Sequence, residues 1–363
     1  MKWYLKLLLL PVFAFNLLTA LLLIGCAYSP MLPAEEMPLL ALSGLAFPFV
    51  LGANVIFLLF WLILYRPFML VSLLSCALCF PQIRALSPIN FFRQKPKGES
   101  IKVVSYNILS SNLKKATANK ENPMIAYLES TGADIICLQE FPFAAVKGDA
   151  STQKLFAEYP YKSYMVSDDS ELSAHFLACL SKYPILSVDK LDFNSTSNGC
   201  TRYRILHEDD TLVVYNCHLQ SNSLNADNKS SYEQLLTNPK GNINEEATKE
   251  LVKKLREATA KRAAQATILM ADVNKQTSPY IIVCGDFNDS PISYTRKLLT
   301  EVLDDAYINS GNGPGFSYNR NKMYYRIDHI LHSKDFKSYA CIVDRTIKTS
   351  DHYPISCYLE KTK

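Results

Sequence analysis

The sequence lacks the cysteine and histidine spacings typical of structural zinc sites, although it contains ten cysteines. Three of them fall in the apolar N-terminal part, and seven follow residue 97. This odd number excludes a complete disulfide framework beyond residue 97, but a single bridge such as Cys200–Cys217 remains open. Most of the seven lie in apolar runs, as Cys137 and Cys284 do, and are predicted to be small buried side chains.

The chain beyond Lys97 also lacks an excess of positive charge. Seven of the 38 basic residues and two of the 34 acidic residues lie at or before Lys97, which leaves 31 basic and 32 acidic residues and a net charge of −1. The net charge of +4 for the whole chain therefore belongs to its N-terminal part. Because general nucleic-acid binding requires a basic surface, this composition argues against it.

Three long runs near the N-terminus lack any charged residue: Leu7–Tyr28 with 22 residues, Leu39–Tyr65 with 27 and Phe68–Ile83 with 16. A helix needs about 20 apolar residues to cross a bilayer. The third run is predicted to be a further span, with a re-entrant or interfacial helix as the alternative. We therefore expect residues 1–86 to form a membrane anchor with two to three transmembrane helices. A cleaved lipoprotein signal ending at Cys26 is the competing interpretation of the first run.

The side of the membrane on which the rest of the chain lies depends on the flanking charges. With three spans and the N-terminus inside the cell, Lys2, Lys6 and Arg66 lie in the cytoplasm. The acidic pair Glu35–Glu36 in the first loop favours this orientation, which puts the C-terminal part outside the cytoplasm. The apparently reduced cysteines favour the reverse. The reverse orientation places four basic residues inside: Arg84, Arg93, Lys95 and Lys97.

Residues 87–100, rich in Pro, Lys and Gly, are predicted to form a linker. Residues 101–363 are predicted to form one α/β domain in which helices cover β-sheets. Helices are expected from Pro123, capped by Asn122, to Gly132 and over Glu245–Lys275. Nine short apolar runs predict strands: Lys102–Tyr106, Ile135–Gln139, Phe176–Leu180, Ile185–Phe193, Cys200–Leu206, Leu212–Cys217, Tyr280–Gly285, Arg326–Leu331 and Tyr353–Leu359.

Polar side chains stand at the ends of many of these strands. Carboxylate and amide oxygens are the ligands that Mg²⁺ or Mn²⁺ prefers, and histidines beside them suit proton transfer and phosphate stabilisation. Each residue alone has an ordinary explanation as a turn residue, a helix cap or a structural histidine, so the combination carries the signal. The residues are Asn107, Glu140, His218, Asp286, Asn288, Asp289, Asp328, His329, Asp351 and His352.

The segments that contain these residues resemble, in their order, the motifs of the endonuclease/exonuclease/phosphatase superfamily. The resemblance runs from about Lys102 to Leu359 and is greatest to membrane-bound members from Bacteroidetes-type bacteria. It implies a four-layer fold of two mixed sheets packed face to face with helices outside. The segments are Ser-Tyr-Asn107, Leu-Gln-Glu140, Asn-Cys-His218-Leu, Gly-Asp286-Phe-Asn288-Asp289, Arg-Ile-Asp328-His-Ile and Ser-Asp351-His352-Tyr-Pro.

The resemblance also implies a divalent metal, Mg²⁺ or Mn²⁺, with Glu140 as its main ligand and Asn107 and Asp351 in support. Abasic-site nucleases of the superfamily carry an acidic residue shortly after the first Asn. Here Ile108 and Leu109 follow Asn107. The missing acid favours the branches of the superfamily that use a histidine at the position of His218.

The remaining site residues take catalytic roles by the same resemblance. Asp286 is expected to orient or activate the attacking water, and Asn288 to contact the phosphate. His352 is expected to stabilise the charge that develops on the phosphate, and Asp328 to orient a catalytic histidine. His218 is expected to be the general acid towards the leaving oxygen or a phosphate ligand.

Three functions stay open at this stage. The first is a nuclease-like phosphodiesterase, and the second acts on a lipid head group or small phosphate ester near the bilayer in which the anchor lies. The third is a catalytically dead membrane scaffold. No protein partner is indicated, and an integral protein of the bacterial inner membrane is expected. The polar segment 222–244 is predicted to be a specificity loop. An aromatic loop could line a pocket, touch lipid or pack in the core: Phe316, Tyr318, Met323, Tyr324 and Tyr325.

Overall fold

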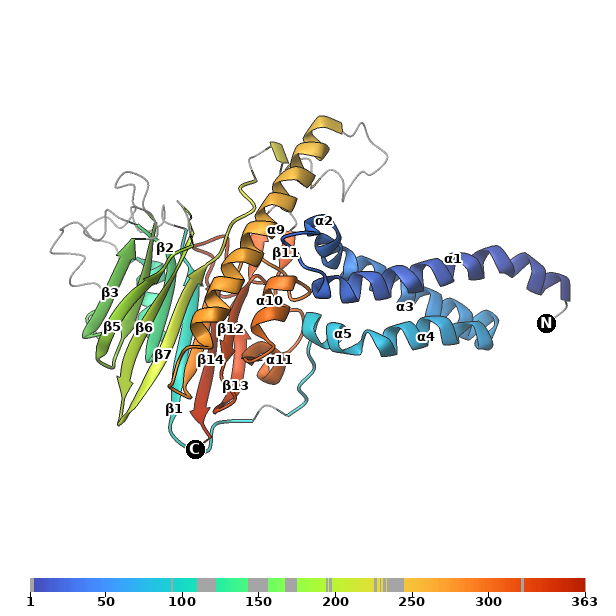
Figure 1. Ribbon diagram of the computed structural model, residues 1–363. Helices are drawn as coiled ribbons and strands as arrows, with labels where there is room; N and C mark the ends of the chain where they lie inside the picture. Colours follow the sequence, from blue (N-terminus) through green and yellow to red (C-terminus); the bar gives the residue numbers. More distant parts are fainter. Residues whose placement is uncertain are drawn as a thin grey trace.

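The computed structural model describes residues 3–92, 94–109, 122–142, 156–166, 175–193, 195, 198–224, 227–228, 230, 233, 245–320 and 323–362. Most of the expected specificity loop 222–244 lies outside these residues. The chain has two parts: a two-sheet sandwich and a bundle of N-terminal helices that projects from one side of it (Figure 1). We call the bundle, residues 3–86, the N-terminal helices.

Two six-stranded mixed sheets form the sandwich. β1 and β2 pair in parallel in the first sheet, β7 and β8 do so in the second, and the other pairs are antiparallel. In spatial order the first sheet is β13 Phe336–Val343, β14 Ile355–Lys361, β1 Ser100–Asn107, β2 Ile135–Pro142, β4 His175–Ser181 and β3 Tyr161–Val166. The second is β5 Ile185–Leu191, β6 Gly199–His207, β7 Asp210–His218, β8 Ile281–Asp286, β12 Asp328–His332 and β9 Asp304–Asp305.

The two sheets bury one face each against the other. Val103 and Ile135 of the first sheet share a buried cluster with Val214 and Ile282 of the second. This alternation of inward and outward side chains follows from the period of two along a strand. The face-to-face packing confirms the expected four-layer fold.

Helices cover the two outer faces. α6 (Pro123–Ser130) lies on the first sheet, where its Leu128 joins Ile136 in a second buried cluster. α9 (Glu245–Val273) and α10 (Tyr294–Leu299) lie on the second sheet, as Figure 1 shows for α9. The Asn122 side chain accepts a hydrogen bond from the Met124 amide, which confirms the predicted N-cap of α6.

All nine predicted strands are present, whereas two full strands, β3 and β13, were not predicted. β3 reads Tyr-Lys-Ser-Tyr-Met-Val and lies at a sheet edge, so its apolar pattern is weak. β13 is likewise an edge strand and is irregular between Tyr339 and Ile342. The short β10 (Tyr318–Arg320) and β11 (Met323–Tyr325) form a separate hairpin within the expected aromatic loop.

The N-terminal helices are α1 (Trp3–Tyr28), α3 (Phe47–Leu64), α4 (Met69–Leu78) and α5 (Phe80–Leu86), joined by η1 (Ser29–Met31), α2 (Pro38–Ala41), η2 (Leu42–Ala46) and η3 (Arg66–Phe68). Two stretches are long and apolar enough to cross a membrane, Leu9–Met31 and Pro38–Leu64. The pair Arg66–Leu78 and Phe80–Leu86 is bent by 65° and is either a broken span or a re-entrant loop. Both alternatives for the third apolar run therefore stay open.

Polar side chains buried between the N-terminal helices hydrogen-bond to one another. The Asn16 amide donates to Ser72 Oγ at 2.8 Å and accepts from the Trp61 indole at 2.9 Å. The Asn54 amide donates to the Thr19 carbonyl at 3.0 Å. Such bonds join helices in an apolar surrounding, where an unpaired polar group would be costly.

The N-terminal helices are docked onto the sandwich. The buried Arg326 guanidinium donates to the carbonyls of Ala85, Leu86 and Pro314. At η2 the backbones approach so closely that a Cβ on Gly44 would lie 2.2 Å from the Ile292 carbonyl oxygen. Position 44 therefore requires glycine.

Residues 87–100 also follow the surface of the sandwich. The Asn90 side chain donates to the carbonyls of Ile308 and Gly311, and the Gly98 amide donates to the Glu360 carboxylate at 2.8 Å. These bonds hold the segment expected to be a linker in place on the domain that follows it.

Gly285 at the end of β8 is expected to be the least replaceable glycine of the sandwich. Its φ is +140°, and a Cβ there would lie 1.9 Å from the Cys217 carbonyl oxygen on β7. We expect Gly285→Ala to lower the free energy of unfolding by about 3 kcal/mol, because backbone must move to admit the methyl group. Chemical denaturation of the full-length protein in detergent measures this. Gly52→Ala, where no atom lies within 4 Å, is the control; equal unfolding midpoints for the two variants would contradict the prediction.

Candidate active site

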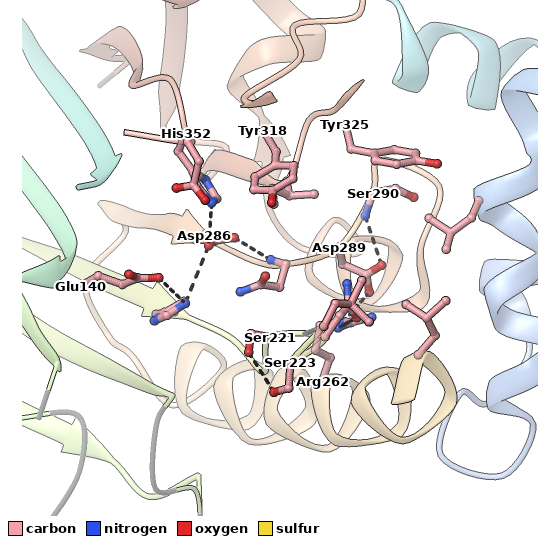
Figure 2. Close-up of a pocket in the computed structure, with 18 of the residues that line it drawn as sticks. Glu140, Ser221, Ser223, Arg262, Asp286, Asp289, Ser290, Tyr318, Tyr325 and His352 are labelled. Carbon is pink, nitrogen blue, oxygen red and sulfur yellow. Dashed lines mark hydrogen bonds and ion pairs between the residues drawn. The ribbon is translucent and has the colours of Figure 1, made fainter. Parts of the chain in front are cut away.

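A cavity of about 280 Å³ opens where strands of the two sheets end. Its walls come from both sheets, from α9, from the β10–β11 hairpin and from η2 (Figure 2). In Figure 2 Glu140, Asp286 and His352 lie on the side away from the N-terminal helices, whose blue ribbon borders the opposite side. The polar residues of this wall include six expected site residues: Glu140, His218, Asp286, Asn288, Asp351 and His352.

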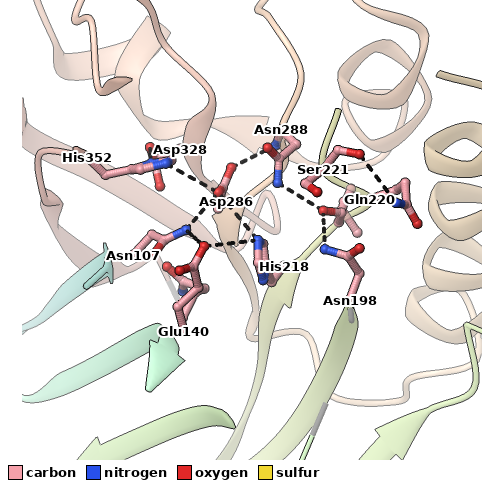
Figure 3. A network of polar contacts seen from close by, with 12 residues as sticks. Asn107, Glu140, Asn198, His218, Gln220, Ser221, Asp286, Asn288, Asp328 and His352 are labelled. Atoms are coloured by element: carbon pink, nitrogen blue, oxygen red, sulfur yellow. Dashed lines mark hydrogen bonds and ion pairs between the residues drawn. The ribbon is translucent and has the colours of Figure 1, made fainter. Parts of the chain in front are cut away.

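The two other expected site residues lie directly behind this wall and are bonded to it (Figure 3). The Asn107 amide donates to Glu140 Oε1 at 3.1 Å and to Asp286 Oδ2 at 3.0 Å. Asp328 is bonded to His352. The structure therefore brings together all eight residues that were expected to bind the metal or take part in catalysis. They come from β1, β2, β7, β12, from β8 and the segment after it, and from the segment before β14.

Two histidines approach the Asp286 carboxylate, His218 from the end of β7 and His352 from the segment before β14. The Nε2 atoms of His218 and His352 lie 3.7 Å and 3.6 Å from Asp286 Oδ2. His218 Nε2 is also 3.9 Å from Glu140 Oε1. Asp286 thus lies between two imidazoles and beside a second carboxylate, which is an arrangement suited to moving protons at a phosphate.

His352 is held as a cation. Burial lowers its pKa, but the nearby carboxylates of Asp328 and Asp286 outweigh this and raise the pKa to about 10. Its Nδ1 lies 2.8 Å from Asp328 Oδ2. A protonated imidazole facing the cavity can stabilise negative charge on a phosphate.

Asp286 is fully buried, and burial raises its pKa above the ordinary range. The Asp328 charge adds to this, whereas His352, His218 and the Asn107 amide oppose it. A carboxylate with a raised pKa is a stronger base than an exposed one, so it suits proton abstraction from water near neutral pH.

Strained backbone places two of the polar groups. Glu140 has φ +54° and Asn288 has φ +51°, both in the left-handed region. Glu140 stands where the register of β2 against β4 shifts between Leu138 and Phe141. The backbone N–H of Asn288 donates to Asp286 Oδ1 at 2.8 Å and so fixes the carboxylate. Such conformations cost about 1–3 kcal/mol each and cluster at functional sites.

Two groups of residues could hold a divalent metal. Ligand atoms of Asp286, Asp328 and His352 lie within 4.8 Å of one another. In this group His352 Nδ1 and Asp328 Oδ2 are already bonded to each other at 2.8 Å. The Glu140 carboxylate is 21% exposed in the cavity and adjoins the Asn107 amide, and Asp351 borders the same cavity. This oxygen-rich set fits Mg²⁺ or Mn²⁺ better.

Arg262 on α9 is a cavity residue for which the sequence predicted no role. Its side chain is 2% exposed, its Nε lies 3.3 Å from Asp289 Oδ2, and it donates to the Gln220 carbonyl at 3.0 Å. It therefore ties α9 to the segments after β7 and β8. The sequence feature that could have indicated this role is the position of an arginine within the apolar repeat of the helix.

His329, which follows Asp328 in the motif, points away from the cavity. It packs on Phe287 with ring centroids 5.0 Å apart, and its Nε2 lies 3.3 Å from the Asp289 carbonyl oxygen. Burial lowers its pKa from 6.5 to about 4. His329 is therefore a neutral side chain of the core.

This burial predicts acid sensitivity. Below about pH 6.5 His329 takes up a proton in the unfolded chain but not in the folded chain. The free energy of unfolding therefore decreases as the pH is lowered from about 6.5 to about 4. The expected loss from this group is about 3 kcal/mol. His329→Gln should flatten the dependence of the unfolding free energy on pH over this window, measured by denaturant titration. An identical slope in the variant would show that His329 does not carry the effect.

A family model described as the Endonuclease/Exonuclease/phosphatase family matches residues 104–352. The chain belongs to this family. Its members are hydrolases that act on phosphodiester bonds, and the chain is accordingly a hydrolase acting on ester bonds. Residues 6–86 match a second model, described as a domain of unknown function (DUF8431). No curated protein matches the chain.

Solved structures of the endonuclease/exonuclease/phosphatase family share the sandwich. The human Nocturnin catalytic domain with bound sulfate anion has 18% identity and a TM-score of 0.52 over 75% of this chain and 97% of that one. A family member from Bacteroides vulgatus has 14% identity and a TM-score of 0.51 over 73% and 100%. D. rerio TDP2 complexed with single strand DNA product has 15% identity and a TM-score of 0.51 over 73% and 100%. At these identities the likeness establishes the fold.

Proposed function

We propose that the chain is a membrane-anchored, divalent-metal-dependent phosphodiesterase whose active site is the cavity around Glu140, Asp286 and His352. The observation that carries the proposal is the convergence of a protonated imidazole, a buried carboxylate of raised pKa and a partly exposed carboxylate on one cavity. A scaffold without activity has no need to keep these groups buried together, since each costs stability.

Glu140, Asn107 and Asp351 are the proposed holders of the metal, for which Mg²⁺ and Mn²⁺ are the candidates. The ion supplies Lewis-acid polarisation of the phosphoryl oxygen when bound. These three residues lie on, or are bonded to, one wall of the cavity.

The proton transfers are assigned to neighbouring residues of the same wall. Asp286 takes a proton from the water that attacks phosphorus, and His218 gives a proton to the leaving oxygen. The cation of His352 stabilises the charge on the phosphoryl oxygens, and the Asn288 amide binds the phosphate. Asp328, which is bonded to His352, is a positioning residue.

The membrane assignment follows the same proposal: residues 1–86 are the anchor, 87–100 the linker and 101–363 the catalytic domain. The two apolar stretches long enough to cross a membrane support it. In Figure 1 the N-terminus lies at the end of the helices remote from the sandwich. With three spans and the N-terminus in the cytoplasm of a bacterial cell, the catalytic domain is outside the inner membrane.

A substrate panel tests the function. Full-length protein, stripped of metal with a chelator, would be incubated with Mg²⁺ or Mn²⁺ and with DNA, RNA, phospholipids, small phosphodiesters and small phosphomonoesters. The proposal expects cleavage of a phosphodiester that stops when chelator is restored. Metal-independent cleavage, or release of phosphate from monoesters alone, would overturn it.

A further inference from the structure

We infer that the natural substrate is a phosphate ester carrying an apolar chain, which enters the cavity from the membrane surface. This inference rests on the proposed function and names the substrate class of the same site. It begins from the composition of the cavity wall. Besides its polar residues the cavity is lined by apolar and aromatic side chains: Leu45, Leu251, Leu255, Ile327, Tyr318 and Tyr325.

Leu45 connects this apolar wall to the membrane anchor. It belongs to η2, within the stretch Pro38–Leu64 that is long and apolar enough to span a bilayer. A side chain of a candidate span thus forms part of the active-site wall. Figure 2 shows the same relation, because the ribbon of the N-terminal segment borders the cavity next to Tyr325 and Ser290.

The position of Leu45 is fixed by packing. Its neighbour Gly44 lies against the Ile292 carbonyl, and Phe47 shares a buried cluster with Ile292. Ala41 packs on Ala263 of α9, with Tyr294 of α10 beside them. The anchor is therefore docked on α9, which lines the cavity, and on α10 beside it.

The neighbouring surface is also apolar. Leu39 and Leu40 on α2 are 57% and 54% exposed, and Val252 on α9 is 40% exposed. α2 packs against α9, so these side chains lie on adjoining helices. Leu39 and Leu40 fall within the candidate span Pro38–Leu64. An apolar substrate chain that leaves the bilayer here would pass over these uncharged side chains on its way to Leu45.

The cavity can orient such a substrate. Glu140, Asp286 and His352, where the phosphate is proposed to bind, lie on the side away from the anchor. The apolar side chains of the lining are then left to contact the organic part of the ester. The domain beyond Lys97 has a net charge of −1, so it offers no general attraction to a polyanion such as nucleic acid.

Matched substrates test the inference. The full-length protein, in a maltoside detergent, would be given glycerophosphodiesters and their dihexanoyl counterparts with choline, ethanolamine or glycerol head groups. Each pair shares one phosphodiester and differs only in the chains. We expect kcat/KM to be at least tenfold higher for a chain-bearing member, since each buried methylene favours binding by about fourfold.

A pair of variants locates the effect. Leu45→Ser should reduce that preference, the ratio of kcat/KM with chains to kcat/KM without them, about tenfold. Leu42→Ser is the control, because Leu42 lies on the same short helix but is not part of the cavity wall. Equal kcat/KM with and without chains, or cleavage of DNA or RNA in preference to every lipid, overturns the inference and leaves the phosphodiesterase intact. Absence of metal-dependent hydrolysis of every ester overturns the proposed function and the inference with it.

Discussion

Glu140→Gln is expected to reduce phosphodiester hydrolysis at least 10³-fold and to leave the fold unchanged. Glu140 is the partly exposed carboxylate of the cavity and adjoins Asn107, His218 and Asp286. The glutamine side chain keeps the shape but has no charge for the metal. Because a metal and its ligands supply several kcal/mol of transition-state stabilisation, the loss should fall on kcat.

The same variant should lose the thermal stabilisation that Mn²⁺ gives to the wild type, because binding to the folded state raises its stability. Glu158→Gln, on an exposed part of the surface, is the matched control and should retain both properties. Full activity in folded Glu140→Gln would remove Glu140 from the site.

Asp328→Asn is expected to lower kcat by about 10²- to 10³-fold. Residue 328 does not touch the substrate and acts through His352. Asp328 is fully buried and binds His352 Nδ1 at 2.8 Å. Burial alone lowers the pKa of His352, and Asp328 is foremost among the groups that raise it to about 10. Without this carboxylate the imidazole is expected to lose its proton near neutral pH. The phosphate then loses its cationic partner, and loss of one such stabilising group typically lowers kcat by about 10²- to 10³-fold.

The dependence of the rate on pH separates this role from a structural one. In Asp328→Asn the remaining rate should rise as the pH is lowered from 8 towards 6, since the imidazole regains its proton. The wild-type rate should lack this rise, because His352 stays charged over the range. Asp209→Asn, in an exposed turn, is the control. A uniform loss at every pH would indicate displacement of His352 instead of loss of its charge.

The strands that form the sheet interiors could be predicted from the sequence, because a strand buried on both faces reads as a continuous apolar run. Ile281–Asp286 and Ile135–Pro142 are examples. The polar residues that end such runs then gave the predicted site. The edge strands β3 and β13 have mixed patterns and escaped prediction.

The sequence could not predict which groups meet across the cavity. Asp286 and His352 are far apart in the chain, and their 3.6 Å approach depends on the pairing of β8 with β12 and on the segment before β14. The orientation of Glu140 depends on a left-handed backbone at a register shift that no residue type announces. The burial of His329 in the core, beside Phe287, likewise depends on packing that the sequence does not specify.

The docking of the N-terminal helices could not be predicted either. An apolar run predicts that a helix is buried in lipid or in protein. It does not predict which of the two, or which part of the protein, covers the helix. Gly44 against Ile292 and Arg326 against the end of α5 are contacts between segments that have no shared motif. Nor could the sequence decide the state of Cys200 and Cys217, which face each other as free thiols with sulfur atoms 3.2 Å apart.

The most direct test of the account is the position of the metal. Crystals of the full-length protein grown with Mn²⁺ would be measured at a wavelength where manganese scatters anomalously. The account predicts an ion held by the Glu140 carboxylate, with Asn107 and Asp351 in support. An ion held by Asp286, Asp328 and His352, or an active protein with no ion in the cavity, would contradict it.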